Sequence, residues 1–587
     1  MNTQTQIGFS SLTINSCFQN HYIVPDYQRE YVWGQEEVEQ LLSDLMEGFQ
    51  TNAKKDYFLG TIVTYKTDGY FELIDGQQRL TTFFILLCTL RRIYAQNNES
   101  TQVVDNLIFS PIMNENGDTV PSYHLKLQYE DASNYLELIY QNMPEPKEKS
   151  ASGEKLFEAF NTIVSFFAHY LSDFGDLKKF AFFLLNKTRF IQIETYDITD
   201  ALKIFETINQ RGIGLNPMDL LKNMIFRQVD RVQFKELNMK WKEITSALEN
   251  IKEKPLRFLR YFIMANYDVS NMKDGILRED QIYSWLTSNN DQCHYVEKPF
   301  EFVSLMKKNV DKYIAYLKPL DNDNGNLHLK CIPLLAGRSY KLHLLLLLSA
   351  FNMDKATLSK FKKVIESAVY YSVINKIPTN QTERTFIGWC VGLRNVKTED
   401  DMKKFVREAM MPTISLWKKT NMQNFMQLGL GSMQQYRVKF IMAKLSAYVD
   451  ALLIGQNEPG DLSSYMATGV DIEHIMPVKC SDIFVYEIAE DEFDMYLNRL
   501  GNLTLLENSI NKSIHNSTYE TKRMTYPQSR FHLTKSIPSL TGVGTNTAIT
   551  RTNQKLKSWS VWTGHSIEER QQMLYELSEE VWSIQIE

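Results

Sequence analysis

The helical periodicity in the middle of the chain limits the fold more strongly than any other feature of the sequence. From about residue 228 to residue 453, apolar side chains recur at the three- and four-residue spacing of helices that pack against one another. β-like runs such as YFLGTIVTY, from Tyr57, precede this region, and the polar break GQNEPGDLSS at 455–464 follows it. Because 587 residues are too many for one core, the sequence predicts a multidomain α+β protein.

Cysteine usage and hydropathy indicate where such a chain works. Its six cysteines are scattered without a CxxC pair, which argues against a zinc ribbon and against a secreted disulfide framework. The opening segment MNTQTQIGFSSLTINS lacks the basic and apolar regions of a signal peptide. The most apolar run, at 342–351, is too short to cross a bilayer and predicts a buried helix. We therefore expect a cytoplasmic protein that does not contact a membrane.

The charge of the chain is unevenly distributed. A net charge of −6 disfavours nucleic-acid binding, but nine lysines and arginines stand against two acidic residues between Met495 and Ser560. Such a stretch is either a solvated face or a surface that contacts DNA phosphates. Lys512, Lys522 and Arg523 are the candidates for contact with DNA.

A motif inside this C-terminal region carries residues suited to phosphodiester hydrolysis. The segment GVDIEHIMP at 469–477 predicts a strand with Glu473 and His474 side by side. His474 can accept a proton from water near neutral pH. Glu473, with the amide oxygen of Asn511, suits a hard cation such as Mg²⁺ or Mn²⁺. His515 follows Asn511 by four residues, so on a helix the two share a face, and His515 is a further candidate ligand or phosphate contact.

Two more residues complete this predicted site. Asn502, directly after Gly501, would brace the hairpin and so hold the loop that carries His474. Asp471 lies on the same strand face as Glu473 and could replace it as a ligand. Each residue alone has a plainer explanation, as a structural histidine or as an asparagine that shapes a turn. The ordered set within a basic stretch favours a metal-dependent nuclease with a strand, hairpin and helix.

A second polar cluster, DGQQRLTT at 75–82, lies between a short strand and a buried helix near the N-terminus. Gly76 permits a tight turn there. The first N–H groups of the helix, together with Arg79 and the amides of Gln77 and Gln78, can bind an anion such as phosphate. The alternative is a polar turn in which Arg79 pairs with a carboxylate.

Two other segments have the same polar character. PDYQR at 25–29 contains Gln28 and Arg29, and FETINQRGIGLNPMDLLKN at 205–223 contains Arg211. The three clusters could meet around one polyanionic ligand, but spacing alone does not establish that they do.

The segments PDYQREYVW, LIDGQQRLTT and FETINQRGIGLNPMDLLKN resemble the DGQQR domain, a ParB/sulfiredoxin-like module of bacterial restriction and phage-defence proteins. The resemblance covers about the first 230 residues and implies binding and hydrolysis of a nucleoside triphosphate (GTP, ATP or another). A Walker motif is absent, so a P-loop NTPase is excluded. The nucleotide-binding residues that the resemblance implies are Asp75, Gly76, Gln77, Gln78 and Arg79, with Gln28, Arg29 and Arg211 nearby.

The C-terminal set EHI-P, GNL-LL and Asn511 resembles HNH endonucleases of the branch that follows DGQQR domains in GmrSD-like modification-dependent restriction enzymes. The regions expected are a nucleotide-binding domain at 1–230, a helical scaffold at 231–455 and an HNH domain at 456–587. The predicted function is nucleotide-regulated, metal-dependent cleavage of foreign, modified phage DNA. The alternative is a nucleotide-gated DNA-binding regulator without nuclease turnover. Both functions are compatible with a homo-oligomer or with a partner defence subunit.

Overall fold

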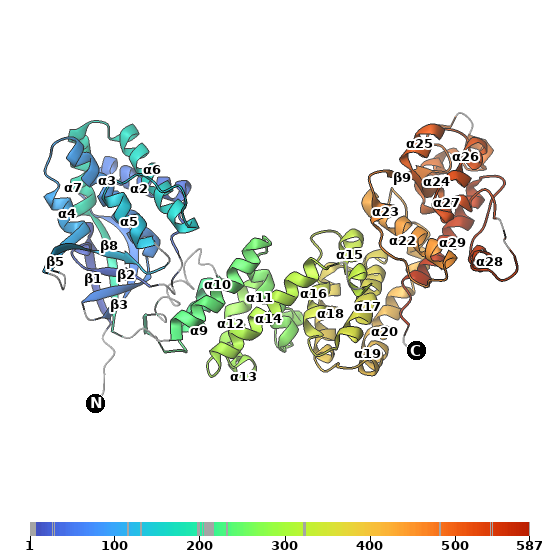
Figure 1. Cartoon of the computed structure of the whole chain (residues 1–587), viewed down its shortest axis with the longest axis horizontal. Coiled ribbons are helices and arrows are strands. Elements are labelled where there is room, and N and C mark those ends of the chain that lie inside the picture. Colours follow the sequence, from blue (N-terminus) through green and yellow to red (C-terminus); the bar gives the residue numbers. More distant parts are fainter. Residues whose placement is uncertain are drawn as a thin grey trace. The chain divides into compact units, whose positions relative to one another are not determined.

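The computed structural model describes residues 7–585 except 26–27, 29, 68, 114–116, 130–131, 197–199, 202–203, 205–216, 231–232, 321–323, 481–482, 541 and 543. The chain forms two compact units (Figure 1). The N-terminal unit comprises Met1–Ser246 and Leu286–Leu305, and the C-terminal unit comprises Ala247–Trp285 and Met306–Glu587. Both contain helices and strands, so the predicted multidomain α+β class is confirmed. The region 231–455 supplies helices to both units.

A six-stranded mixed sheet forms the centre of the N-terminal unit, in the order β1-β8-β3-β4-β2-β7. β3 runs parallel to β8 and antiparallel to β4, and β2 runs parallel to both β4 and β7. The predicted β-like run from Tyr57 forms β3, and the short strand expected before the DGQQRLTT segment forms β4. The strands of this unit are β1 (Gly8–Thr13), β2 (Tyr22–Val24), β3 (Tyr57–Thr67), β4 (Tyr70–Asp75), β7 (Leu125–Leu127) and β8 (Thr188–Thr195), with a separate hairpin of β5 (Phe109–Met113) and β6 (Thr119–Tyr123).

Helix α3 (Gln77–Gln96) is buried along its middle. Every residue from Leu80 to Leu90 is buried, and the helix packs against α4, α5 and α6. The predicted buried helix is thereby confirmed, and its first turn is fixed to the core. The other helices of this unit are α1 (Ile14–Cys17), α2 (Gln35–Asn52), α4 (Gln102–Ile108), α5 (Ala132–Tyr140), α6 (Ala151–Tyr170), α7 (Phe174–Lys187), α9 (Pro217–Phe226), α10 (Phe234–Asn250) and α13 (Asn290–Cys293).

The C-terminal unit begins with packed helices, as their apolar periodicity predicts. The leucine-rich run at 342–351 forms the fully buried helix α16. Among the described residues, no helix combines the length and hydropathy that a membrane crossing requires. These helices are α11 (Pro255–Asn266), α15 (Asn324–Ala336), α16 (His343–Ser349), α17 (Lys355–Ile374), α18 (Thr379–Leu393), α19 (Glu399–Phe405), α20 (Met411–Lys418), α21 (Asn421–Phe425) and α22 (Gln435–Leu453). Two more, α12 (Ile282–Ser288) and α14 (Pro299–Leu317), contribute residues to both units.

A buried ionic network ties these helices to the chain beyond residue 580. Glu366 on α17 lies 2.6 Å from the His328 Nδ1 atom on α15 and 3.1 Å from the Lys444 ammonium on α22. The indole of Trp582 donates a hydrogen bond to the same carboxylate at 3.2 Å. Although burial alone would raise the pKa of Glu366, Lys444 and His328 outweigh it and hold that pKa at about 2.

The end of the C-terminal unit contains two antiparallel strands followed by a helix. β9 pairs with β10 in a register that places His474 opposite Leu503, and α25 follows β10 directly. The predicted order of strand, strand and helix is confirmed. Its elements are α23 (Ser463–Met466), β9 (Val470–His474), α24 (Phe493–Asn498), the short 3₁₀ turn η7 (Leu500–Asn502), β10 (Leu503–Glu507), α25 (Asn508–Ile514), α26 (Tyr519–Thr525), α27 (His532–Lys535), α28 (Ala548–Asn553) and α29 (Gly564–Val581).

Helix α29 begins earlier than the sequence suggests. The serine and glutamate at 566 and 569 have the spacing of a capping box, but Thr563 is the N-cap and accepts a hydrogen bond from the Ser566 backbone N–H. The helix packs against η7, the turn that leads into β10.

Candidate functional site

Three of the predicted site residues meet at the end of β9. Glu473, His474 and His515 line one pocket of about 360 Å³. Strand pairing with β10 fixes the backbone of Glu473 and His474, and the segment after α25 contributes His515. The full lining is Glu473, His474, Val478, Lys479, His515, Asn516 and Lys522.

Glu473 is buried and already paired with a cation. Only 6% of the residue is exposed, and its Oε1 atom lies 2.6 Å from the ammonium of Lys522, which also donates a hydrogen bond to the His474 carbonyl. Burial raises the pKa of Glu473, and the charge of Lys522 partly opposes that rise. The predicted contact between Lys522 and DNA is therefore wrong, because this residue on α26 is 1% exposed and faces inward.

The imidazole of His474 has the properties of a proton acceptor. Its Nε2 atom is buried and has no hydrogen-bond partner among the described residues. Burial, assisted by the charge of Lys522, lowers the pKa of His474 below its ordinary value of 6.5. An imidazole in its neutral form can take up a proton from water.

Asn502 holds the chain that follows His474. It is fully buried, and its Oδ1 atom accepts hydrogen bonds from the Met476 backbone N–H at 2.8 Å and from the Trp562 indole at 3.0 Å. Its Nδ2 atom donates to the carbonyl of Leu497 at 2.9 Å. The side chain thus lies where the predicted bracing role requires it.

Helix α25 brings Asn511 to Asp471 rather than into the pocket. The Asn511 and Asn508 amides donate to the same Asp471 oxygen, at 3.2 Å and 2.9 Å. The expected shared helix face of Asn511 and His515 is wrong, because α25 ends at Ile514 and His515 adopts a φ of 44° outside the helix. His515 nevertheless lines the pocket.

Residues of α29 that sequence reasoning missed fix the turn before β10. The buried Arg570 donates hydrogen bonds to the carbonyls of Gly501, at 2.8 Å, and Leu503, at 2.7 Å. Gln571 accepts a hydrogen bond from the Gly501 N–H and donates one to Phe425. A signal existed in the sequence, since an arginine and a glutamine interrupt the apolar face of an amphipathic helix.

The pocket wall offers a few atoms that could coordinate a cation. A carboxylate, two imidazoles and an asparagine are on its wall, and the Lys522 ammonium already stands against the carboxylate. In the part of the chain that the structure describes, no three His, Cys, Asp or Glu side chains are grouped closely enough to hold a metal by themselves. Mg²⁺ is commonly bound through one or two carboxylates, waters and substrate phosphates, which is compatible with this arrangement.

The basic stretch is partly neutralised by acids of α29 that lie beyond Ser560. Arg499, Lys555 and Lys557 form ion pairs at 3.2, 2.5 and 3.3 Å, respectively, with Glu568, Glu580 and Glu569. Of the predicted DNA contacts, Lys512 is exposed. Arg523 is half-buried and donates to the Ser560 carbonyl at 2.7 Å.

In the N-terminal unit, the DGQQR segment forms a tight junction between β4 and α3. Gly76 has a φ of +89°, and a Cβ there would lie 2.5 Å from the Ile62 side chain, so this position requires glycine. Arg79 donates to the β3 carbonyls of Leu59 and Thr61, each at 2.8 Å, and lies 4.0 Å from Asp75. These two guanidinium nitrogens are therefore directed at β3. Burial raises the pKa of Asp75, although the positive charge of Arg79 opposes that rise.

The neighbouring amide side chains connect this junction to the segment at 25–33. Gln78 accepts a hydrogen bond from the Val32 N–H and donates one to the Glu30 carbonyl, both at 2.9 Å. Gln28 is buried, and its Nε2 atom has no hydrogen-bond partner among the residues described. Arg29 and Arg211, two of the predicted nucleotide-binding residues, lie outside the described residues.

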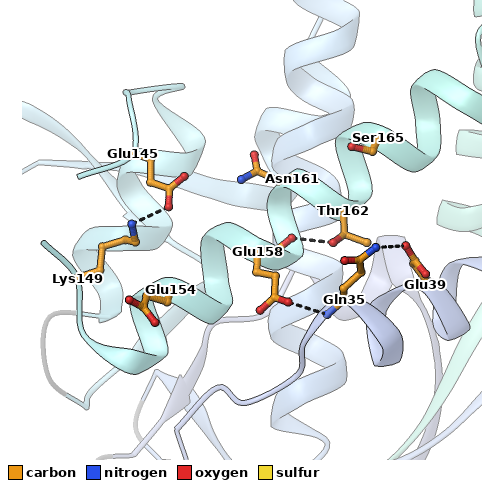
Figure 2. A pocket seen from close by; sticks show the side chains of 9 residues that line it. All are labelled: Gln35, Glu39, Glu145, Lys149, Glu154, Glu158, Asn161, Thr162 and Ser165. Atoms are coloured by element: carbon orange, nitrogen blue, oxygen red, sulfur yellow. Dashed lines mark hydrogen bonds and ion pairs between the residues drawn. The ribbon is translucent and has the colours of Figure 1, made fainter. Parts of the chain in front are cut away.

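The N-terminal unit also has a pocket of about 520 Å³, beside α2 and α6. Figure 2 shows Gln35 bonded to Glu39 at its amide and to Glu158 at its backbone N–H, and Lys149 paired with Glu145. Because glutamates outnumber the single lysine, this pocket does not suit a polyphosphate. Its lining consists of Gln35, Glu39, Glu145, Lys149, Glu154, Glu158, Asn161, Thr162 and Ser165.

Two family models match the chain. The model described as "GmrSD restriction endonuclease, N-terminal domain" matches residues 10–226, and the one described as "GmrSD restriction endonucleases, C-terminal domain" matches residues 419–577. The matched ranges together cover more than half of the chain, and each lies within one unit. With the strand–strand–helix site, these matches define a restriction endonuclease, an enzyme whose substrate is DNA. The chain belongs to the GmrSD-like restriction endonuclease family. No curated protein matches it in sequence.

Proposed function

We propose that the chain is a metal-dependent HNH endonuclease that cuts foreign, modified phage DNA under the control of a nucleotide. One observation carries the nuclease assignment. His474, at the end of β9, has a buried Nε2 atom that lacks a hydrogen-bond partner among the described residues, and the residue lines a pocket with Glu473 and His515. That combination suits the activation of water beside a phosphodiester.

Each residue has a separate task in this proposal. His474 accepts the proton of the attacking water, and Asn502 keeps the chain after it in place. Lys479, exposed at the pocket wall, attracts the DNA phosphate. A bound Mg²⁺ or Mn²⁺ would polarise the phosphate and stabilise the leaving oxygen. Glu473 and His515 would hold that ion, and Asp471 on β9, which accepts a hydrogen bond from the Asn511 amide of α25, would offer a further carboxylate nearby.

Plasmid cleavage with Mg²⁺ or Mn²⁺ tests the nuclease assignment. We expect wild type to nick or cut the plasmid, EDTA to stop cleavage, and His474→Ala to lower the rate at least a hundredfold, the contribution typical of a general base. His565→Ala is the matched control, because that imidazole is 78% exposed and lies outside the pocket. Full cleavage by His474→Ala, or by wild type in EDTA, would refute the proposal. DNA binding by wild type without cleavage would favour a nucleotide-gated regulator.

We place the nucleotide at the start of α3, where a 20-residue helix begins directly after the Gly76 turn. The buried amide of Gln28 lies in the adjoining segment and supports a polar ligand there. In this proposal Gln78 and Arg79 shape the site through their bonds to the segment at 25–33 and to β3, rather than through the phosphates.

Thermal unfolding with GTP, ATP and other nucleoside triphosphates tests the proposed nucleotide site. A true ligand at a hundred times its Kd stabilises the folded protein by about 2.7 kcal/mol. We expect one triphosphate to raise the melting temperature and to change the cleavage rate of modified phage DNA. If no triphosphate alters either quantity, nucleotide control is wrong, and the nuclease assignment is judged by plasmid cleavage alone.

A further inference from the structure

Lys522 has an unusual position for a lysine. Its side chain is 2% exposed, its ammonium lies 2.6 Å from Glu473, and it donates to the carbonyl of His474. Both contacts are made at the end of β9. The lysine comes from α26, more than forty residues further along the chain, so it joins two elements that the strand pairing does not connect.

A buried lysine of this kind acts as a fixed monovalent cation. Its ammonium is a compact point charge with three donors, and the carboxylate of Glu473 compensates that charge away from water. Removing one partner would leave the other charge uncompensated in a desolvated site. The pair therefore keeps Glu473 and the backbone of His474 in place without any metal.

The same carboxylate faces the pocket in which a divalent ion would bind. A divalent ion at Glu473 must either displace the ammonium or lie within a few ångströms of it, and both arrangements weaken its binding. We propose that Lys522 is a positioning residue that occupies the cation position beside Glu473, so that a divalent ion binds this pocket in competition with the ammonium. This inference rests on the proposed metal-dependent function of the same site.

Calorimetric titration of the full chain with Mn²⁺, in the absence of DNA, tests the competition. We expect Lys522→Met to bind Mn²⁺ at least tenfold more tightly than wild type, since the carboxylate then has no competing cation. Without metal the variant should melt at a lower temperature than wild type, and Mn²⁺ should raise its melting temperature by more. Equal or weaker Mn²⁺ binding by Lys522→Met, or no binding by either protein, would overturn the inference.

Three further variants keep the test decisive. Lys555→Met, which removes a lysine from an exposed pair with Glu580, should leave Mn²⁺ affinity unchanged. The double variant Glu473→Gln/Lys522→Met, which has no unpaired charge, should lose the gain in affinity. If Lys522→Met does not fold, Lys522→Arg decides instead, because it retains the cation and should bind Mn²⁺ no more tightly than wild type. Tighter binding by Lys522→Arg would refute the competition.

Plasmid cleavage separates this inference from the proposed function. If wild type does not cleave DNA with metal but Lys522→Met binds Mn²⁺ more tightly, the proposed nuclease function is wrong. The inference that the Lys522 ammonium competes with the metal is then still supported. If wild type cleaves DNA and Lys522→Met shows no gain in Mn²⁺ affinity, only the inference about Lys522 is wrong, and the proposed nuclease function is retained.

Discussion

Replacement of Asn502 by alanine should weaken the C-terminal unit and the nuclease together. The change removes the partner of the Met476 N–H, the Trp562 indole and the Leu497 carbonyl, and all three residues are buried. Each buried polar group left unpaired costs about 1–3 kcal/mol, so the free energy of unfolding should fall by at least about 3 kcal/mol. Gln572→Ala is the control, because it removes a single exposed bond to Glu576.

Amide hydrogen exchange and plasmid cleavage measure the two effects. A loss of about 3 kcal/mol corresponds to roughly a hundredfold faster exchange at the Met476 N–H. Cleavage should slow at the same time, since the chain that follows His474 is no longer held. If Asn502→Ala exchanges Met476 and cleaves DNA as the Gln572→Ala control does, the bracing argument is incorrect.

Two other substitutions test the framework of each unit. Gly76→Ala should destabilise the N-terminal unit by roughly 2 kcal/mol or more. A left-handed backbone costs alanine about 1–2 kcal/mol, and the added Cβ would also clash with the Ile62 side chain. An unchanged melting temperature would contradict this prediction. The pKa of Glu366 is depressed from 4.5 to about 2, so its pairing with Lys444 and His328 stabilises the fold fully above pH 4.5 and is lost as pH falls towards 2. Between pH 5 and 3, wild type should therefore lose more thermal stability than Glu366→Gln; equal slopes would show that the network does not stabilise the fold.

The sequence predicts the elements of the nuclease site better than the orientation of its side chains. β9 and β10 follow from short apolar runs around EHI and GNL, and strand pairing then brings Glu473 and His474 to one end. The sign of a charge does not reveal which face of a helix carries it. The sequence therefore predicts that Lys522 contacts DNA, although its side chain is buried.

Errors at element ends have a similar physical origin. The four-residue spacing of Asn511 and His515 predicts a shared helix face only if the helix continues, and α25 ends one residue before His515. The basic stretch ends in the sequence before the acidic residues of α29 begin, and the two are brought together only by folding. In the N-terminal unit, the Gly76 turn was predictable from sequence. The bonds of Arg79 to β3 were not, because they depend on a tertiary contact.

The bonds from α29 to the Gly501 turn have a consequence for the order in which the enzyme becomes active. Arg570 and Gln571 follow Gly501 by 69 and 70 residues in the sequence. During synthesis, the ribosome must therefore add this whole stretch before the turn that leads into β10 receives its anchors. A nascent chain that already contains His474 therefore still lacks the anchors of the turn that leads into the neighbouring strand, β10.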